Sequence, residues 1–449
     1  MKNKKKKWSD LMANDQLFKT HYTALAAGIS GNSDPDAVIS LRKSAIREFA
    51  ELSFPTKKDE PWKYSKVDGL LSSLFSPAQN MSAVSDSLLS SARFGNLETD
   101  RYVFVDGKLN PALTQKSPDS SVSVITLKEA FASVPNFAET FLSKSTDKSD
   151  LFANLGSAFL QDGAFISIPD RKIQTRPVHL LFISTGNLVQ PKLIISAGKS
   201  SESTFIEHFI SDGNPAGFTN VSTGLFLAEN AVVHHTKITD ESDNGFHIGR
   251  IEAFQQTNST WKSHVITMGG GMVRNEVTAR LSGEGVNCLM NGLYLVTGTH
   301  HVENITLIDH QKPNGTSQES YKGILSDKST GVFDGKIIVQ KDAQKTYANQ
   351  SNRNLLLSDE ATADSKPQLE IYADDVNCFH GATVGQLDEM QLFYLQSRGI
   401  GEPMAKAMLT HAFAVDVLNS IPQTEIREYL DQQILERLHS PFHFEETEV

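Results

Sequence analysis

Residues 101–385 carry short runs in which apolar and polar side chains alternate, and this pattern constrains the fold more than any other feature. In EVTARLS (276–282) and GKIIVQ (335–340), apolar residues recur at every second position, and PQLEIYADD (367–375) repeats the pattern. Successive side chains of a β-strand point to opposite faces, so each run predicts a strand. No long amphipathic helix separates these runs, which disfavours a doubly wound parallel sheet.

Units of a turn followed by a strand recur along this region at a nearly constant spacing. They begin near residues 229, 257 and 283, which are 28 and 26 residues apart. A repeat of this length is typical of coils that stack on their neighbours. The recurrence therefore predicts a β-solenoid, while its irregularity leaves a large β-sandwich as the alternative.

An amphipathic helix is predicted near the N-terminus. Apolar residues recur there at steps of three and four, as on one face of a helix, and they are Val38, Leu41, Ala45, Phe49 and Leu52. Asp34 is expected to cap this helix, with Pro35 at its first helical position. We expect helices and loops to continue to residue 100.

Two further helical stripes follow residue 386. The first contains Met404, Met408, His411, Val415 and Leu418, and the second contains Ile426, Leu430, Ile434 and Leu438. These patterns divide the chain into an N-terminal helical region (1–100), a β-helix core (101–385) and a C-terminal helical region (386–449).

Composition excludes several classes of function. The 449 residues carry a formal net charge of −11, which disfavours nucleic-acid binding because such binding needs a basic face. The lysine run at 2–7 is expected to be a solvated tail, and no apolar stretch approaches the roughly 20 residues of a membrane-spanning helix. Two cysteines rule out a disulfide framework, so we expect a cytoplasmic protein.

Cys378 lies two residues before His380, and this pair is the candidate site. On a strand, both side chains would share a face with Val376, which favours burial inside a coil. Thiolate and imidazole also suit iron, but two ligands cannot complete a four-ligand site. The pair is therefore either structural or one half of a metal site that a partner chain completes.

Two other features of the sequence are expected to have structural rather than functional roles. Gly198, Lys199 and Ser200 resemble the end of a phosphate-binding loop, but the first glycine is missing and Leu193 stands there. Any ATP-driven step must therefore use another chain. Cys288 lies in an apolar strand and is expected to be a small core residue.

Four long segments resemble one known family. They are FPTKKDEPWKYS (54–65), the segments 318–346 and 352–389, and LFYLQSRGI (392–400). Together they closely resemble the SufB/SufD family of subunits in the Suf system for iron–sulfur cluster assembly. The glycine after His380 is typical of the SufD branch, because SufB-like sequences typically carry Glu at that position.

The resemblance implies both a fold and partners. Members have an N-terminal helical region, a right-handed parallel β-helix and a C-terminal helical region. SufD-like members act as non-catalytic scaffolds that pair with SufB through the β-helix. His380 would then lie near a transient iron–sulfur cluster shared with SufB, with Cys378 beside it. No cofactor is expected on the isolated chain, which is expected to be able to form a homodimer.

The resemblance also implies that the C-terminal region binds the ATPase SufC. The candidate contact residues are Leu392, Phe393, Leu395 and Arg398. Two alternatives come from other classes of function. One is a β-helix carbohydrate-active enzyme, a lyase or hydrolase, and the other is a subunit associated with transport.

Overall fold

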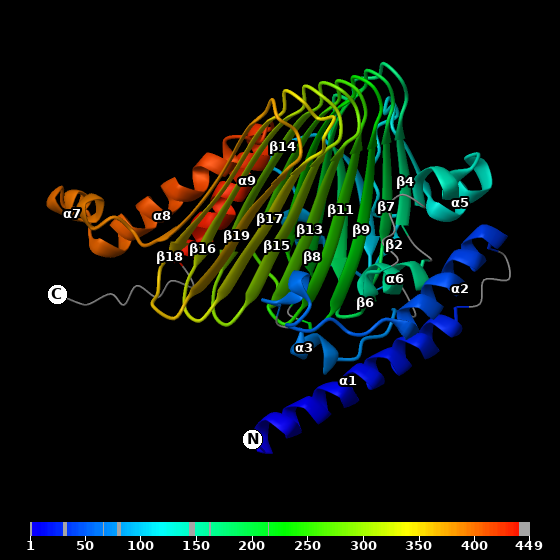
Figure 1. Cartoon of the computed structure of the whole chain (residues 1–449), viewed down its shortest axis with the longest axis horizontal. Helices are drawn as coiled ribbons and strands as arrows, with labels where there is room; N and C mark the ends of the chain where they lie inside the picture. Colours follow the sequence, from blue (N-terminus) through cyan, green and yellow to red (C-terminus); the bar gives the residue numbers. More distant parts are fainter. Residues whose placement is uncertain are drawn as a thin grey trace.

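The computed structural model describes residues 2–29, 34–65, 67–78, 82–142, 149–160, 163–213 and 215–439. Its centre is a β-solenoid of stacked parallel strands, with helices from both ends of the chain packed around it (Figure 1). The predicted fold class is therefore confirmed. The β-sandwich alternative is wrong, because consecutive coils pair in parallel rather than antiparallel.

Each coil contributes one strand to each of two ten-stranded sheets in the described part of the chain. Sheet A consists, in spatial order, of β2 (Lys108–Leu109), β1 (Asp100–Val105), β5 (Val178–Ser184), β8 (Glu202–Ser211), β10 (Val232–Asp240), β12 (Thr260–Thr267), β14 (Asn287–Val296), β16 (Thr316–Leu325), β18 (Tyr347–Leu356) and β20 (Asn377–Gly385).

Sheet B faces sheet A across the core of the solenoid. It consists, in spatial order, of β19 (Thr362–Ile371), β17 (Thr330–Val339), β15 (His301–His310), β13 (Met272–Leu281), β11 (Phe246–Gln255), β9 (Phe218–Leu227), β7 (Lys192–Ala197), β4 (Gly163–Ile168) and β3 (Ser123–Thr126), and β6 (Leu188–Val189) also pairs with β9.

A turn geometry that recurs from coil to coil explains the sequence repeat. Val232, Thr260, Asn287 and Thr316 align in neighbouring strands of sheet A, so one coil takes about 28 residues. Two residues before most of these strands, the chain adopts positive φ, at Asn230, Asn258, Gly285 and Asn314. Glycine and asparagine tolerate this conformation better than other residues, so they terminate each coil where the sequence showed turns.

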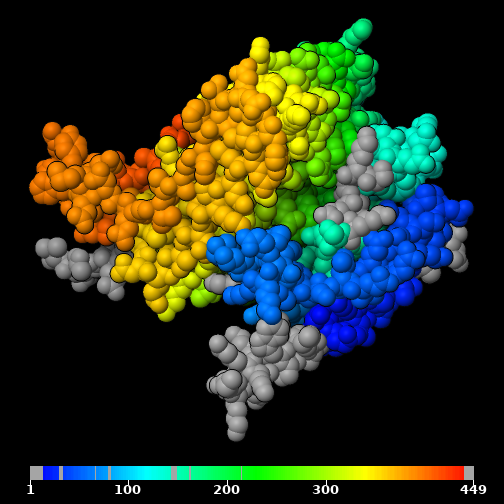
Figure 2. Space-filling view, viewed as in Figure 1, coloured from blue at the N-terminus to red at the C-terminus, as the bar shows by residue number. Residues whose placement is uncertain are grey.

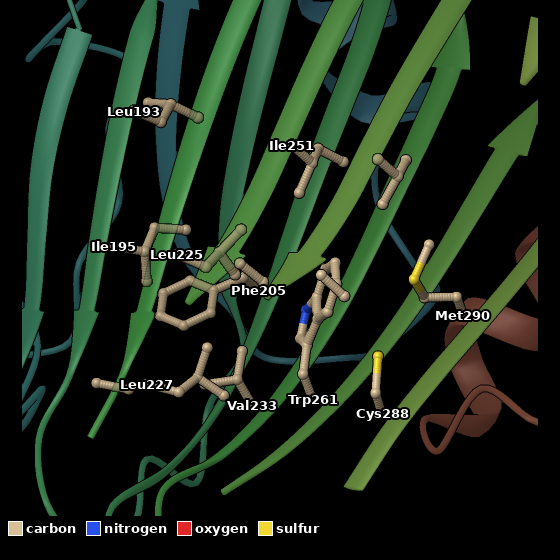
Figure 3. Close-up of a cluster of buried hydrophobic side chains, with 14 of the residues drawn as sticks. Leu193, Ile195, Phe205, Leu225, Leu227, Val233, Ile251, Trp261, Cys288 and Met290 are labelled. Carbon is tan, nitrogen blue, oxygen red and sulfur yellow. The ribbon is translucent and has the colours of Figure 1, made fainter. Parts of the chain in front are cut away.

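Apolar side chains fill the space between the sheets. They include Leu193, Phe205, Leu225, Ile251 and Trp261, which point toward one another from both sheets (Figure 3). Cys288 is buried in the same cluster, as the sequence predicted, and burial raises the pKa of its thiol. The alternating pattern of EVTARLS is also confirmed, because Val277, Ala279 and Leu281 all lie in this core.

The N-terminal helices pack mainly beside sheet B. They are α1 (Lys2–Ala27), α2 (Asp36–Glu51), η1 (Glu60–Trp62) and α3 (Asp68–Leu71), followed by α4 (Asp86–Ser91), α5 (Leu127–Ser133), the π-helical turn η2 (Ala138–Leu142) and α6 (Leu151–Ala158). Phe49 and Phe152 share a hydrophobic core with Phe218 of β9 and Ile248 of β11. α2 and α6 therefore lie beside the lower part of sheet B (Figure 1).

One expectation for the N-terminal region is wrong. Asp34 does not cap α2, whose N-cap is Pro35 without a side-chain bond. The Asp34 carboxylate instead accepts from Arg42 at 2.7 Å and lies 3.7 Å from Lys128, and both neighbours lower its pKa. The backbone of the lysine run at 2–7 is helical and forms the start of α1.

The C-terminal helices are α7 (Glu389–Ser397), α8 (Glu402–Leu418) and α9 (Thr424–His439). The stripe predicted for α9 is confirmed, because its four apolar residues are buried against isoleucines on the outer face of sheet A. The stripe predicted for α8 is wrong in part. Met404 and Met408 are exposed, while Ala414 and Val417 face the sheet, because close packing there favours small side chains.

No helix in the described part of the chain combines the length and the apolar character needed to cross a membrane.

His411 of α8, expected to pack in an apolar stripe, is only partly buried. Its Nε2 lies 2.5 Å from Asp431 Oδ1 of α9, so it links the two helices through a polar contact.

Candidate functional site

The candidate site lies on the last coil of the solenoid. β19 and β20 are the final strands of their sheets, and no further strand pairs with them among the described residues. We call this end of the solenoid the open end. Of the residues of β20, Cys378 is half-buried and the others are exposed. Both strand edges and side chains are therefore available at this end.

Cys378 faces the interior of the solenoid. It aligns with Ala348 of β18, and with Val376 it packs against the hydrophobic core. Burial raises the pKa of its thiol, and a backbone hydrogen bond from Ala348 acts in the opposite direction. A thiol with a raised pKa is a weak nucleophile and a weak metal ligand at neutral pH. The geometry therefore favours a packing role for Cys378.

His380 lies on the same face of β20 but is exposed, because no further coil covers it. It aligns with Gln350 of β18 in the parallel pairing. Its imidazole makes no hydrogen bond or ion pair within the described residues. Both ring nitrogens are thus available to an external ligand or partner.

A polar row continues from His380 into the solenoid. Gln350 aligns with Glu319 of β16, and Gln350 Nε2 donates to Glu319 Oε2 at 2.7 Å. Glu319 is 2% exposed, and burial raises its pKa to about 7. The sequence analysis did not find these two residues. Their positions in the sequence could have indicated them. Both are polar residues at inward positions of strands, where the alternating pattern predicts apolar residues.

The adjacent inward row contains both cysteines of the chain. Parallel pairing aligns Cys288, Ser317, Ala348 and Cys378 on successive strands of sheet A. Neighbouring strands lie about 4.8 Å apart, so the two sulfurs belong to rungs separated by roughly 14 Å. The two thiols therefore cannot form a disulfide or bind one metal ion together.

Two of the buried histidines deeper in the solenoid, His235 and His301, are paired with carboxylates. His235 Nε2 lies 3.0 Å from Glu207 Oε1, and His301 Nε2 lies 2.5 Å from Glu303 Oε1. Glu303 also accepts from Arg274, whose guanidinium lies 3.8 Å from the ring centroid of Trp62. These contacts fix the N-terminal segment to sheet B and explain why charged residues are tolerated there.

The residues predicted to bind a second partner lie on α7. Leu392 and Leu395 are half-buried, while Phe393 and Arg398 are exposed. Phe393 is 66% exposed, and the neighbouring Tyr394 is 58% exposed. Figure 2 shows this helix, in orange, at the margin of the molecule. α7 thus presents an apolar surface that packs against little of its own chain.

A complete metal site is absent from the described ranges. No three side chains of His, Cys, Asp or Glu come together there in a way that could hold a metal ion. Cys378 and His380 could therefore contribute at most part of a ligand set, and a metal or cluster at the open end would need ligands from another chain.

Comparison with protein families covers nearly the whole chain. Residues 181–413 match the SufBD core domain of the SUF system for FeS cluster assembly, and residues 12–180 match the SufBD protein N-terminal region. The chain belongs to the SufBD family. The boundary between the two family domains falls within β5, so both of them contribute strands to the solenoid.

Curated relatives agree with this assignment. The chain is 31% identical to the iron-sulfur cluster assembly protein SufD of Escherichia coli over 400 residues, which are 88% of this chain and 90% of that protein. It is 29% identical to a SufBD family iron-sulfur cluster assembly protein of Synechocystis over 90% of this chain and 92% of the relative. SufD of Bacillus subtilis is 28% identical over 74% of this chain and 78% of its own length.

Proposed function

We propose that this SufBD family chain is a non-catalytic scaffold that pairs with SufB through its open end and presents His380 to a transient iron–sulfur cluster. The observation that carries the proposal is the exposure of His380 on an unpaired edge strand of the last coil. The names of the relatives favour assembly over a β-helix carbohydrate-active enzyme.

Pairing through the open end follows from the chemistry of a free strand edge. Unpaired backbone N–H and C=O groups at an edge favour the addition of another strand. Large apolar side chains are also exposed there, among them Tyr372 at 60%, Phe379 at 56% and Val384 at 49%. A related solenoid that adds its own edge strands would satisfy the backbone groups and bury these side chains. The isolated chain is expected to form a homodimer by the same contacts.

The role proposed for His380 is that of a single ligand. Neutral imidazole donates a nitrogen to iron, and this ring has no competing partner in the described residues. SufB would supply the remaining ligands. One ligand from this chain holds a nascent cluster weakly, which suits a scaffold that must release its product. Cys378 packs behind this position rather than binding the cluster.

Docking of SufC is proposed to use α7. Phe393, Tyr394 and the 74% exposed Met390 form an apolar helical surface of the kind that fills a groove on a partner. Arg398 lies at the C-terminal end of α7, with its guanidinium 5.3 Å from the ring centroid of Tyr394. This contact orients the arginine beside the apolar surface.

The test of the cluster site compares two variants in the complete complex with SufB and SufC. His380→Ala should lower iron per purified complex severalfold without reducing the yield of the complex. Cys378→Ser should change iron content little, because a packed thiol mainly loses apolar contacts. Normal iron content per complex in His380→Ala would contradict the proposed ligand role.

SufC docking is tested separately with a surface substitution. Phe393→Asp should weaken SufC binding at least tenfold, measured by calorimetry, because an exposed anchor is replaced by a charge. Leu17→Asp on α1 is the matched control, since Leu17 is 54% exposed at a distant helix. Equal SufC affinity for Phe393→Asp and the control would refute the assignment to α7.

A further inference from the structure

A polar cavity lies at the opposite end of sheet A from His380. It has a volume of about 340 Å³ and lies between the loop 93–99, which follows α4, and the first strands of sheet A. Its lining includes Arg93, Arg101, Arg176 and His179. The cavity therefore concentrates cationic side chains in a chain whose net charge is −11.

Arg101 is the most buried of the three arginines that line the cavity. It is 4% exposed, and its Nη1 donates to the carbonyl oxygen of Leu89 at 3.0 Å, at the end of α4. Its Nε has no hydrogen-bond partner, and no carboxylate pairs with the guanidinium among the described residues. Burial lowers the pKa of Arg101, and the nearby charge of Arg93 lowers it further. A buried cation without a counterion is costly, and an anion in the cavity would remove that cost.

The neighbours of Arg101 add more hydrogen-bond donors than carboxylates. His179 aligns with Arg101 in the pairing of β1 with β5, is 1% exposed, and has an Nε2 without a hydrogen-bond partner. Arg176 pairs with Glu98 at 2.7 Å, but the Glu98 side chain is 74% exposed. Arg93 has no ion pair within the described residues. The lining thus has three guanidinium groups and one carboxylate.

We infer that this cavity binds a small molecule that carries a phosphate or carboxylate group. Guanidinium groups present planar pairs of N–H donors that match the oxygens of both anions. The buried Arg101 and His179 would fix the anionic group, and the exposed Arg93 and the half-buried Arg176 would hold it at the entrance. This inference does not rest on the cluster scaffold role, because the cavity and the open end lie at opposite ends of sheet A.

The volume and the lining residues of the cavity restrict the class of ligand further. A volume of about 340 Å³ exceeds that of one phosphate ion and falls in the lower range of small-molecule pockets. Phe94 lines the cavity but is 2% exposed, so it offers no open ring face for stacking a base. The structure therefore favours a compact polar anion, such as a phosphorylated or polycarboxylated metabolite, over a ligand bound through an aromatic ring.

Calorimetric titration of the full chain with inorganic phosphate, pyrophosphate and citrate at constant ionic strength tests the inference. At least one of these anions should bind and raise the melting temperature, because a ligand that binds the native state stabilises it. Pyrophosphate without citrate would assign the phosphate class, and citrate without pyrophosphate would assign the carboxylate class. No binding of any of the three above the chloride baseline would overturn the inference.

Substitutions then locate the bound anion. Arg93→Gln should weaken binding about tenfold without loss of stability, because its side chain is exposed. Arg47→Gln on α2 is the matched control, as an exposed arginine outside the cavity, and should leave affinity unchanged. Arg101→Gln should weaken binding further, and circular dichroism will show whether it remains folded. Equal affinities for Arg93→Gln and Arg47→Gln would place the anion elsewhere and overturn the inference.

Discussion

At the N-terminal end of the solenoid, β2 and β3 pair antiparallel with the first coil, whereas at the C-terminal end β19 and β20 have no further neighbours in the described residues. All six residues of β1 are buried, while most of β20 is exposed. An antiparallel strand closes an end because it breaks the parallel register that another coil would extend. The strands at the two ends have the same coil geometry. The difference in their burial therefore depends on whether other parts of the chain cover that end.

The side chains that point into the solenoid also differ between its two ends. Phe104 of β1 stacks on Phe182 at a centroid distance of 4.6 Å, and Phe182 stacks on Phe209 at 4.7 Å. At the open end, the inward positions of β20 hold Cys378, His380, Ala382 and Val384 rather than aromatic residues. A closed end is stabilised by aromatic packing within the chain. The inward face of β20 has no such stack of rings, and most of that strand is exposed.

The largest expected effect compares apolar aromatic residues at the two ends. Phe104→Ala should lower the free energy of unfolding by about 3–5 kcal/mol, because it leaves a cavity in a stack of aromatic rings. Phe379→Ala should change it by no more than about 0.5 kcal/mol, because that ring is 56% exposed. Urea denaturation of both variants measures the difference. Equal losses would show that the open end is packed in solution.

Most of the fold could be predicted from the sequence, because each coil repeats the same local rules. Alternation in EVTARLS and turn residues such as Asn230 and Asn258 set the strands and their period. The packing face of α8 could not be predicted from apolar spacing, because alanines rather than methionines approach sheet A. Local sequence preferences do not determine which face of a helix packs against a sheet that is distant in the sequence.

The candidate site was predictable only as a pair of residues. The i and i+2 spacing placed Cys378 and His380 on one face, and both do lie on one face of β20. Their different burial depends on where the solenoid stops, which no local pattern encodes. The row of Gln350 and Glu319 and the cavity around Arg101 join residues that the topology alone brings together.

The next prediction uses the row that leads inward from the open end. Burial raises the pKa of Glu319 from its ordinary value of 4.5 to about 7. Between these values the folded state holds a proton that the unfolded state has lost, so stability should fall as pH rises from about 4.5 to 7 and then level off. At about 1.4 kcal/mol for each pKa unit, the total loss is about 3 kcal/mol.

Glu319→Gln tests the origin of that slope. The amide is neutral at every pH, so the variant should gain stability relative to the parent chain as pH rises toward 7. Glu370→Gln is the control, because Glu370 is a partly exposed carboxylate that pairs with Lys336 on the outer face of sheet B. Unfolding measured across this pH range should separate the two variants. Parallel pH profiles for the parent chain and Glu319→Gln would show that this carboxyl ionises normally.

A smaller effect is expected for pairing at the open end. Val384→Lys should weaken binding to SufB by about tenfold to a hundredfold, because a lysine on an edge strand opposes the addition of another strand. Ile173→Lys is the control at the closed end, where Ile173 is 66% exposed. Analytical ultracentrifugation of mixtures with SufB compares the two variants. Similar affinities would exclude the open end as the pairing surface.

The smallest expected effect is a difference in thiol reactivity between the two cysteines, which lie at different depths in the solenoid. Cys288 is 1% exposed between neighbouring strands, whereas Cys378 is half-buried on the last strand. At mildly alkaline pH, a thiol reagent should therefore modify Cys378 slowly and Cys288 only after unfolding. Cys378→Ala should abolish the slow reaction, while Cys288→Ala should leave it intact. Because a covered strand would shield its thiol, addition of SufB should slow the modification of Cys378 in the parent chain, and an unchanged rate would mean that the partner does not cover the open end.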